Sequence, residues 1–210
     1  LSIVDVGVIS DLSEFDGGIH KKIKPGTANL LREPAMSATE CAAAIAVGRA
    51  EAKAAIEAGA NLLIAGDMGI GNTTASACLI CRETGAAPEA VVGFGTGVDE
   101  NGRNLKVDVV KAALTRISGY ADDQLLQQVG GVEIAAMAGF YLQAAESGVP
   151  VVIDGFIASA AALAARIVEP EVINWMLASH ISHENGHALA LKALRLEALI
   201  NFEMRLGEGS

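Results

Sequence analysis

The stretch Gly66-Asp67-Met68-Gly69-Ile70-Gly71-Asn72-Thr73-Thr74 decides the fold, because it joins an apolar run at residues 61–65 to an alanine-rich run at residues 75–81. A strand that breaks at glycines and restarts as a helix directs several free backbone N–H groups toward one point, where the helix dipole also favours negative charge. The stretch therefore predicts an anion site, most often a phosphate site. Taken alone, the same glycines are equally consistent with a tight turn that binds nothing.

The glycine spacing excludes two well-known phosphate-binding motifs. A Walker loop requires a lysine after its last glycine, and Asn72 occupies that position. A dinucleotide-binding loop requires the pattern G-x-G-x-x-G, which Gly66, Gly69 and Gly71 do not supply. An anion bound here is therefore held by a loop of a different kind.

Three further segments repeat the order of apolar run, small or polar residues and helical pattern. They are residues 91–97 before 105–114, residues 149–153 before 158–167, and residues 172–178 before 187–196. Four such units predict an α/β fold with a parallel sheet. Ligands of such sheets bind at the carboxyl ends of the strands, so we expect residues 66–74, 93–99, 154–156 and 179–184 to converge.

Composition restricts the class of protein. The 210 residues are 51% hydrophobic and carry a net charge of −10 with only 15 scattered lysines and arginines, which argues against a nucleic-acid surface. The longest apolar window, residues 149–168, is interrupted by Asp154 and Gly155 and predicts a buried strand and helix rather than a membrane span. Three cysteines and no visible signal peptide favour the cytoplasm.

Two short motifs have competing interpretations. Residues 183–187 read His-Glu-Asn-Gly-His, which matches the H-E-x-x-H signature of zinc proteases, yet Asn-Gly is a poor helix interior, so the capped start of a helix is the favoured interpretation. Cys78 and Cys81 form C-x-x-C inside an apolar helical pattern, where two core residues are favoured over a redox or metal pair. Cys41 is expected to pack inside another alanine-rich helix.

Four charged residues are candidates for the site. Lys106 follows the glycine-rich residues 93–97 and could meet a carboxylate or phosphate, although an exposed helical lysine is the alternative. Asp67 and Asp154 each end an apolar strand, where they could serve the site or cap the next helix. Glu208 lies between two glycines and could approach a ligand closely, or could be a solvated turn residue.

Strings along nearly the whole chain resemble those of the nicotinate-nucleotide:dimethylbenzimidazole phosphoribosyltransferase family, which makes the lower-ligand nucleotide of cobalamin. The strings are Val4-Asp5-Val6-Gly7, Gly26-Thr27-Ala28-Asn29, Glu33-Pro34-Ala35-Met36, residues 66–74, Gly95-Thr96-Gly97, residues 131–139 (GVEIAAMAG), Asp154-Gly155-Phe156-Ile157, Ser179-His180 with Glu184 and Gly186-His187, and Arg205-Leu206-Gly207-Glu208-Gly209. The family motif S-H-x-S-x-E-x-G-H makes H-E-x-x-H an accidental overlay. One departure is Asp67, where the family commonly has Glu.

The resemblance implies a reaction in which the ribose 5-phosphate of nicotinate mononucleotide is transferred to a nitrogen of 5,6-dimethylbenzimidazole, giving alpha-ribazole 5-phosphate and nicotinate. It implies a Rossmann-like three-layer α/β/α fold with a small second helical domain, a homodimer, and no metal or cofactor. It also implies that Glu208 is the catalytic base and that Asp67 and Lys106 lie near it. The remaining residues expected to bind the substrates are Met68, Gly69, Gly71, Asn72, Thr73, Gly95, Thr96, Gly97, Asp154, Gly155, Phe156 and Ser182.

The same resemblance bears on domain organisation. We expect residues 1–210 to form one main α/β domain and to be a fragment that lacks the family's N-terminal segment and C-terminal helix. The N-terminal segment carries much of the azole pocket in the family, so the natural acceptor base stays open. A truncated or non-catalytic nucleotide-binding homologue, or a relative that uses another azole, a purine or a phenol, is the alternative function.

Overall fold

A four-stranded parallel sheet forms the centre of the computed structural model, which describes residues 1–95 and 97–202. The strands β3 (Leu63–Ala65), β4 (Val151–Ile153), β5 (Met176–His180) and β6 (Ala198–Ile200) lie side by side in this order, and each neighbouring pair is parallel. Leu63 is in register with Val151, and Val151 with Met176, so the carboxyl ends of these strands reach one edge of the sheet. The predicted parallel sheet is confirmed.

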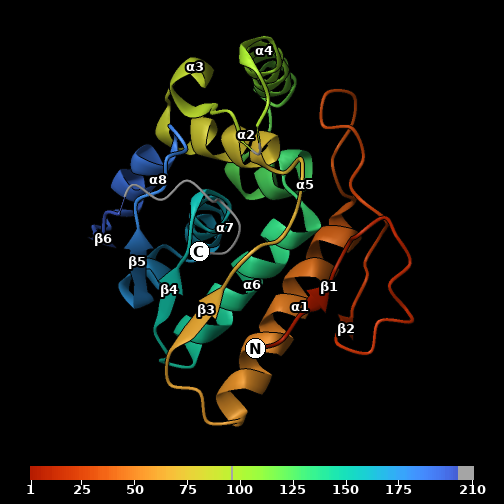
Figure 1. Cartoon of the computed structure of the whole chain (residues 1–210), viewed down its shortest axis with the longest axis vertical. Helices are drawn as coiled ribbons and strands as arrows, with labels where there is room; N and C mark the ends of the chain where they lie inside the picture. Colours follow the sequence, from red (N-terminus) through yellow and green to blue (C-terminus); the bar gives the residue numbers. More distant parts are fainter. Residues whose placement is uncertain (96, 203–210) are drawn as a thin grey trace.

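Helices make every connection between these strands. Before β3 comes α1 (Ala38–Glu57), and β4 is followed by α7 (Phe156–Val168), the 3-10 helix η2 (Pro170–Trp175) and β5, which leads through α8 (His187–Leu194) to β6. The long β3–β4 connection contains α2 (Thr73–Thr84), α3 (Pro88–Val91), α4 (Glu100–Arg116), the 3-10 helix η1 (Asp122–Gln124), α5 (Leu125–Val129) and α6 (Val132–Glu146). Figure 1 shows α2, α3 and α4 gathered beyond one end of the sheet.

The apolar window at residues 149–168 divides into β4 and α7, as predicted. Six of the 13 residues of α7 are alanine, and residues 158–165 are all buried. Small side chains let this helix lie close to its neighbours α2, α6 and α8, which it contacts. In the part of the chain that the structure describes, each helix is too short or too polar to cross a bilayer.

Glycines bring α1 and α6 into backbone contact. A Cβ placed on Gly48 would lie 1.7 Å from the carbonyl oxygen of Ala136, and one on Gly139 would lie 2.1 Å from the carbonyl oxygen of Ile45. These distances are far inside van der Waals contact, so only glycine fits at either position. The two helices run together along the molecule in Figure 1 and anchor the N-terminal third of the chain to the core.

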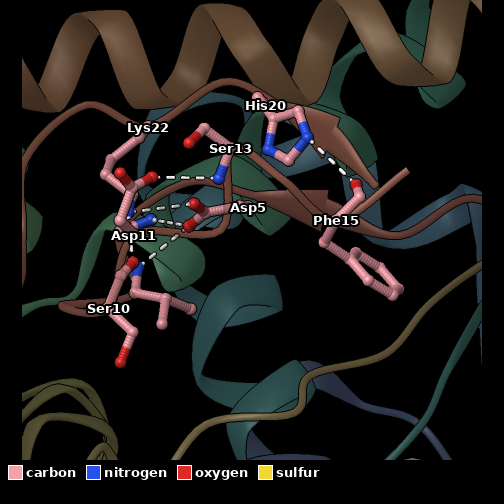
Figure 2. A network of polar contacts seen from close by, with 9 residues as sticks. Asp5, Ser10, Asp11, Ser13, Phe15, His20 and Lys22 are labelled. Atoms are coloured by element: carbon pink, nitrogen blue, oxygen red, sulfur yellow. Dashed lines mark hydrogen bonds and ion pairs between the residues drawn. The ribbon is translucent and has the colours of Figure 1, made fainter. Parts of the chain in front are cut away.

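The first 37 residues are organised around a buried aspartate. The short parallel strands β1 (Val4–Asp5) and β2 (Ile19–His20) lie beside α1. Figure 2 shows Asp5, whose Oδ1 accepts from the backbone N–H groups of Gly7 (3.1 Å) and Val8 (2.9 Å), while its Oδ2 lies 3.3 Å from Nζ of Lys22. The chain therefore turns at Gly7, and the ion pair closes the loop between the strands.

The sequence misassigned some boundaries around the sheet. Residues 91–95 are not the expected strand, because Pro88 begins the short helix α3 and Gly95 and Gly97 have left-handed φ angles of +56° and +114°. The fourth strand is instead β6, whose apolar residues 198–200 were not predicted as a strand. The segment at 172–178 begins as η2 after Pro170 and becomes a strand only at Met176.

One face of the sheet carries exposed apolar side chains. Ile64 is 63% exposed, Leu177 45% and Leu199 66%, whereas the alternate positions Leu63 and Met176 are buried. Alternation of this kind places successive side chains on opposite faces of a strand. The buried face is covered by α6 and α7, and the opposite face is an apolar surface.

Candidate functional site

The glycine loop, residues 66–74, lies between β3 and α2 as predicted. Gly71 has a left-handed φ of +92°, which favours glycine, and α2 begins two residues later at Thr73. Asn72 does not cap the helix; its side-chain amide instead donates to Oδ2 of Asp67 at 2.8 Å. Met68 and Ile70 are 83% and 88% exposed, so the tip of the loop is apolar and open to ligands.

Lys106 reaches the glycine loop from α4. Its ammonium group donates to Oγ1 of Thr73 at 2.9 Å and to the carbonyl oxygen of Gly93 at 3.4 Å. Burial lowers the pKa of Lys106, and the negative charge of Glu184 opposes that shift. The first turn of α2 thus has a partly buried cation beside its free N–H groups, an arrangement suited to an anion.

Glu184 joins this group from the loop between β5 and α8. Its Oε1 accepts from the backbone N–H of Gly95 at 2.9 Å, and its Oε2 is buried without a hydrogen-bond partner among the described residues. We call Thr73, Lys106, Glu184 and residues 93–95 the lysine side of the site. It draws on three of the loops that the sequence predicted to converge.

Three carboxyl groups form the other half of the site, which we call the carboxyl side: Asp67 from the glycine loop, Glu133 from α6 and Asp154 from the end of β4. Burial raises the pKa of all three. The charge of Asp67 raises the pKa values of Glu133 and Asp154 further, so Asp67 lies close enough to act on both. The carboxyl side is therefore acidic, partly buried and short of compensating charge.

Neighbours of the carboxyl side are also polar and buried. His180, at the end of β5, is a source of positive charge that lowers the pKa of Asp154 against the effect of burial. The Tyr141 hydroxyl on α6 is buried with no hydrogen-bond partner in residues 1–95 and 97–202. Burial raises the pKa of Tyr141, and the negative charges of Asp154 and Asp67 raise it further. A hydroxyl group left in this state is costly unless something else bonds to it.

His187 stiffens the loop after β5. Its Nδ1 accepts from the backbone N–H of Ser182 at 2.8 Å, so Nε2 carries the proton and donates to Oγ of Ser159 at 3.1 Å. Burial, with a smaller effect of His180, lowers the pKa of His187 to about 4, which keeps the ring neutral near pH 7. Both ring nitrogens are thus engaged within the fold.

The zinc-protease motif lacks the geometry that its chemistry needs. The helix α8 begins only at His187, and His183 is exposed in the preceding loop, so the two histidines do not lie one turn apart on a helix. The predicted helix start is confirmed, but its N-cap is Gly186, so the predicted side-chain cap is absent. In residues 1–95 and 97–202, no group of three or more His, Cys, Asp or Glu side chains is arranged to hold a metal ion.

The cysteines lie in the core, as predicted. Cys78 and Cys81 are buried on α2 and Cys41 on α1, and all three are free thiols. Burial raises the pKa of Cys78 and of Cys81 to about 12, which disfavours the thiolate needed for redox chemistry or metal binding. Their role is packing.

The structure brings most of the predicted site residues to one edge of the sheet. Gly69, Asn72, Thr73 and Lys106 meet at the glycine loop, and Asp154 lies with the carboxyl side. Gly155 precedes the first residue of α7, and that residue, Phe156, is buried in the core. Ser182 uses its backbone N–H for His187. Thr96 and Glu208 lie outside the described residues.

Two residues of the site, Glu133 and Glu184, were not predicted as site residues. Glu184 belongs to residues 179–184, which the sequence predicted to converge on the site, and to the zinc motif and the family strings, but none of these gave it a role of its own. Glu133 follows Gly130-Gly131 in the first turn of α6, and a Cβ on Gly131 would lie 2.2 Å from its Oε1. A glutamate placed beside paired glycines at a helix start is the signal that could have identified it.

Known proteins resemble the chain over its whole length. The family model DBI_PRT, described as a phosphoribosyltransferase, matches residues 1–210. The chain belongs to this phosphoribosyltransferase family. A relative from Chromobacterium violaceum, named nicotinate-nucleotide--dimethylbenzimidazole phosphoribosyltransferase, is 58% identical over 212 residues, and one of the same name from Thermus thermophilus is 46% identical over 209 residues.

Solved structures of the family have the same fold. The crystal structure of CobT from Thermus thermophilus matches with a TM-score of 0.94 and 45% identity over 99% of this chain, and confirms the expected α/β class. The alignments cover 61% and 62% of the two relatives and 63% of the CobT chain. The chain therefore spans about three fifths of the length of the family members it matches.

Proposed function

We propose that this chain is the nucleotide-binding part of a nicotinate-nucleotide:dimethylbenzimidazole phosphoribosyltransferase. The observation that carries the proposal is the position of the Lys106 ammonium group, which comes from α4 to the Thr73 hydroxyl at the start of α2. A cation, a hydroxyl group and free helix N–H groups at one point are suited to the 5-phosphate of nicotinate mononucleotide. Family membership and the names of the relatives support this substrate.

The two sides of the site suggest how the substrates lie. Phosphate would be repelled by Asp67, Glu133 and Asp154, whereas ribose hydroxyl groups and an azole N–H can donate to carboxylate oxygens. We therefore place the phosphate on the lysine side, with the ribose and dimethylbenzimidazole toward the carboxyl side. The two sides share the glycine loop, so one segment positions both ends of the nucleotide.

The reaction needs a positioned nucleophile and a proton acceptor. An azole nitrogen forms a bond to the anomeric carbon as the bond to nicotinate breaks, and the electron pair of that bond leaves with the pyridine ring. Direct displacement inverts the anomeric carbon, and the azole N–H proton passes to a carboxylate. We propose Glu208 as that base, with no cofactor or metal, on the strength of the family resemblance.

We also propose that the working protein is a cytoplasmic homodimer with a small second helical domain. The apolar sheet face that displays Ile64, Leu177 and Leu199 supports this proposal, because an exposed apolar face of this kind is typical of a surface that another domain or protomer covers. Light scattering on the complete natural chain should give the mass of two protomers. A monomer at micromolar concentration would contradict the dimer.

The function is tested by incubating the complete natural chain with nicotinate mononucleotide and dimethylbenzimidazole and following nicotinate release by chromatography. Release is expected, and Glu208→Gln should lower turnover by at least about 100-fold with little change in mononucleotide binding. Unchanged turnover would remove Glu208 from the mechanism. Binding of the mononucleotide without any release would instead indicate a nucleotide-binding module.

A further inference from the structure

Glu184 inserts its carboxylate into a space that only glycines leave open. A Cβ on Gly93 would lie 2.0 Å from Oε2 and 3.3 Å from Oε1 of Glu184, so the carboxylate rests directly on the backbone at this point. Two residues later, the N–H of Gly95 donates to Oε1 at 2.9 Å. One side chain from the loop after β5 thus holds a segment that lies 89 residues away in sequence.

The loop that carries Glu184 is itself well supported. The carbonyl oxygen of Glu184 accepts from the backbone N–H of His187 at 3.0 Å, and the His187 ring accepts from Ser182. A Cβ on Gly186 would lie 2.6 Å from Cγ1 of Val91, so this loop packs tightly against the end of α3. Glu184 is therefore presented by a rigid base rather than by a free loop.

Lys106 depends on the same segment. Its Nζ lies 3.4 Å from the carbonyl oxygen of Gly93 and would lie 3.2 Å from a Cβ on Gly95, so residues 93–95 form the wall against which the ammonium group rests. The other contact, Thr73 Oγ1, is neutral, and Glu184 is the charged group that acts on Lys106 from the elements packed around it. Movement of residues 93–95 would therefore take both the Gly93 carbonyl oxygen and the charge of Glu184 away from the Lys106 ammonium group.

The surroundings of Glu184 fit a role in holding residues 93–95 and Lys106 better than a role in contact with substrate. Its Oε2 is buried and makes no hydrogen bond within the described residues, although unpaired buried carboxylate oxygens are costly. The position is therefore explained best by a requirement for negative charge beside Lys106. A neutral side chain could hold Gly95 but could not supply that charge.

We propose that Glu184 is a positioning residue, which ties residues 93–95 to the loop after β5 and thereby holds the Lys106 ammonium group at the start of α2. The proposal rests on the proposed function, because it assigns to Lys106 the phosphate of nicotinate mononucleotide. Two variants separate its two parts. Glu184→Gln keeps an oxygen that can accept from Gly95 but removes the charge, and Glu184→Ala removes both.

The experiment uses the complete natural chain and three variants, with the exposed Glu197→Gln as the matched control. Hydrogen exchange of the Gly95 amide should be faster in Glu184→Ala and unchanged in Glu184→Gln. The KM for nicotinate mononucleotide should rise about tenfold or more in Glu184→Ala, which corresponds to the loss of one charge-assisted contact. The control should match the wild-type protein in every measurement.

The pH profile supplies a measurement that a merely structural role would not change. Glu184 raises the pKa of Lys106 against the effect of burial, so its removal allows Lys106 to lose its proton at lower pH. Mononucleotide affinity in Glu184→Gln should therefore begin to fall at a lower alkaline pH than in the wild-type protein. This readout remains available if Glu184→Ala does not fold.

Each contrary outcome has a distinct meaning. Unchanged exchange of the Gly95 amide in a folded Glu184→Ala variant would overturn the proposed tie. Faster exchange of the Gly95 amide, together with a wild-type KM and a wild-type fall of mononucleotide affinity at alkaline pH, would overturn the positioning of Lys106. Failure of the wild-type protein to bind nicotinate mononucleotide would refute the proposed function, and the exchange of Gly95 would still decide whether Glu184 makes the tie.

Discussion

On the lysine side of the site, Lys106 and Glu184 carry opposite charges, and the ammonium group contacts Thr73 at the start of α2 and Gly93 in the segment that Glu184 holds. On the carboxyl side, Asp67, Glu133 and Asp154 carry like charges, and burial raises the pKa of each. The two sides meet at the glycine loop, where Thr73 serves the lysine side and its neighbour Asn72 serves Asp67.

The difference teaches how one sheet edge can handle both ends of a nucleotide. A cation with a nearby opposite charge forms a stable, preformed anion site. Like charges that are partly buried together repel one another, and a ligand that donates hydrogen bonds to them reduces this repulsion. A ligand with an anionic end and a donor-rich end fits this division. Single substitutions on each side test whether the two sides are as different as their contacts indicate.

The largest expected effect separates the two sides directly. Lys106→Met should weaken nicotinate mononucleotide binding by about 100-fold, because a charged hydrogen bond to phosphate contributes about 1.5–3 kcal/mol. Asp67→Asn should leave the affinity within about threefold while lowering turnover, since a carboxylate adds nothing to phosphate binding and the Asn side-chain oxygen can still accept from a ribose hydroxyl group. Titration calorimetry measures both affinities.

The matched control for this comparison is Lys111→Met, on the same helix. Lys111 pairs with Glu89 at the surface, 2.5 Å from Nζ to Oε1, and should not affect the affinity. Equal losses in the Lys106 and Lys111 variants would mean that the effect comes from net charge and not from the site. A strong loss of affinity in Asp67→Asn would remove the division between the two sides.

A smaller effect is expected for Gly93→Ala, which fills the space that the Glu184 carboxylate occupies. The added Cβ would lie 2.0 Å from Oε2, so the variant should lose about 2 kcal/mol of unfolding free energy through overpacking. Gly119→Ala is the control, because a Cβ there meets nothing within 4 Å. Urea unfolding that gives the same stability for both variants would show that the carboxylate moves aside without cost.

The smallest effect concerns the carboxyl side. Because burial raises the pKa of Glu133, the folded protein binds this proton more tightly than the unfolded chain, and the resulting stability is present below pH 4.5 and lost as the pH rises through the folded pKa. Glu133→Gln should therefore raise Tm at pH 7 by about 3 °C and have little effect at pH 4. Thermal unfolding at both pH values measures the difference.

Glu197→Gln makes the same chemical change at an exposed position and should leave Tm unchanged at pH 7 and pH 4. A gain in Glu133→Gln that persisted at pH 4 would contradict an electrostatic origin. A loss of stability at pH 7 would indicate that the Glu133 carboxylate is a net stabilising group, and the carboxyl side would then resemble the lysine side.

The sequence was sufficient for the parallel sheet and for the glycine loop, because strand-to-helix joints leave local patterns. It also associated Lys106 with that loop through the glycine-rich residues before it, although the strand expected there is absent and α3 takes its place. Residues 91–97 were misread because an apolar pair beside glycines is equally typical of a strand and of a packed loop, and only the φ angles of Gly95 and Gly97 decide. The strand at residues 198–200 is as long as β3 and β4, but its sequence is not followed by the helical pattern that identified those two strands.

The missing parts of the site have a different cause. Glu184 contacts Gly95 across 89 residues, and local patterns predicted only that their two segments converge, not which side chain joins them. The carboxyl side is likewise assembled from Asp67, Glu133 and Asp154 on separate elements, so its electrostatic cost exists only in the folded molecule. Glu208, by contrast, was proposed from family resemblance and lies outside the described residues.

The central claim is that Lys106 and the start of α2 bind the phosphate of the nucleotide. Calorimetric affinities for nicotinate mononucleotide and for the same nucleoside without its phosphate, measured on the wild-type protein and on Lys106→Met, test it most directly. We predict that the wild-type protein prefers the phosphorylated ligand by about 100-fold and that most of this preference disappears in Lys106→Met. An unchanged preference, or an equal loss of affinity for both ligands, would contradict the claim.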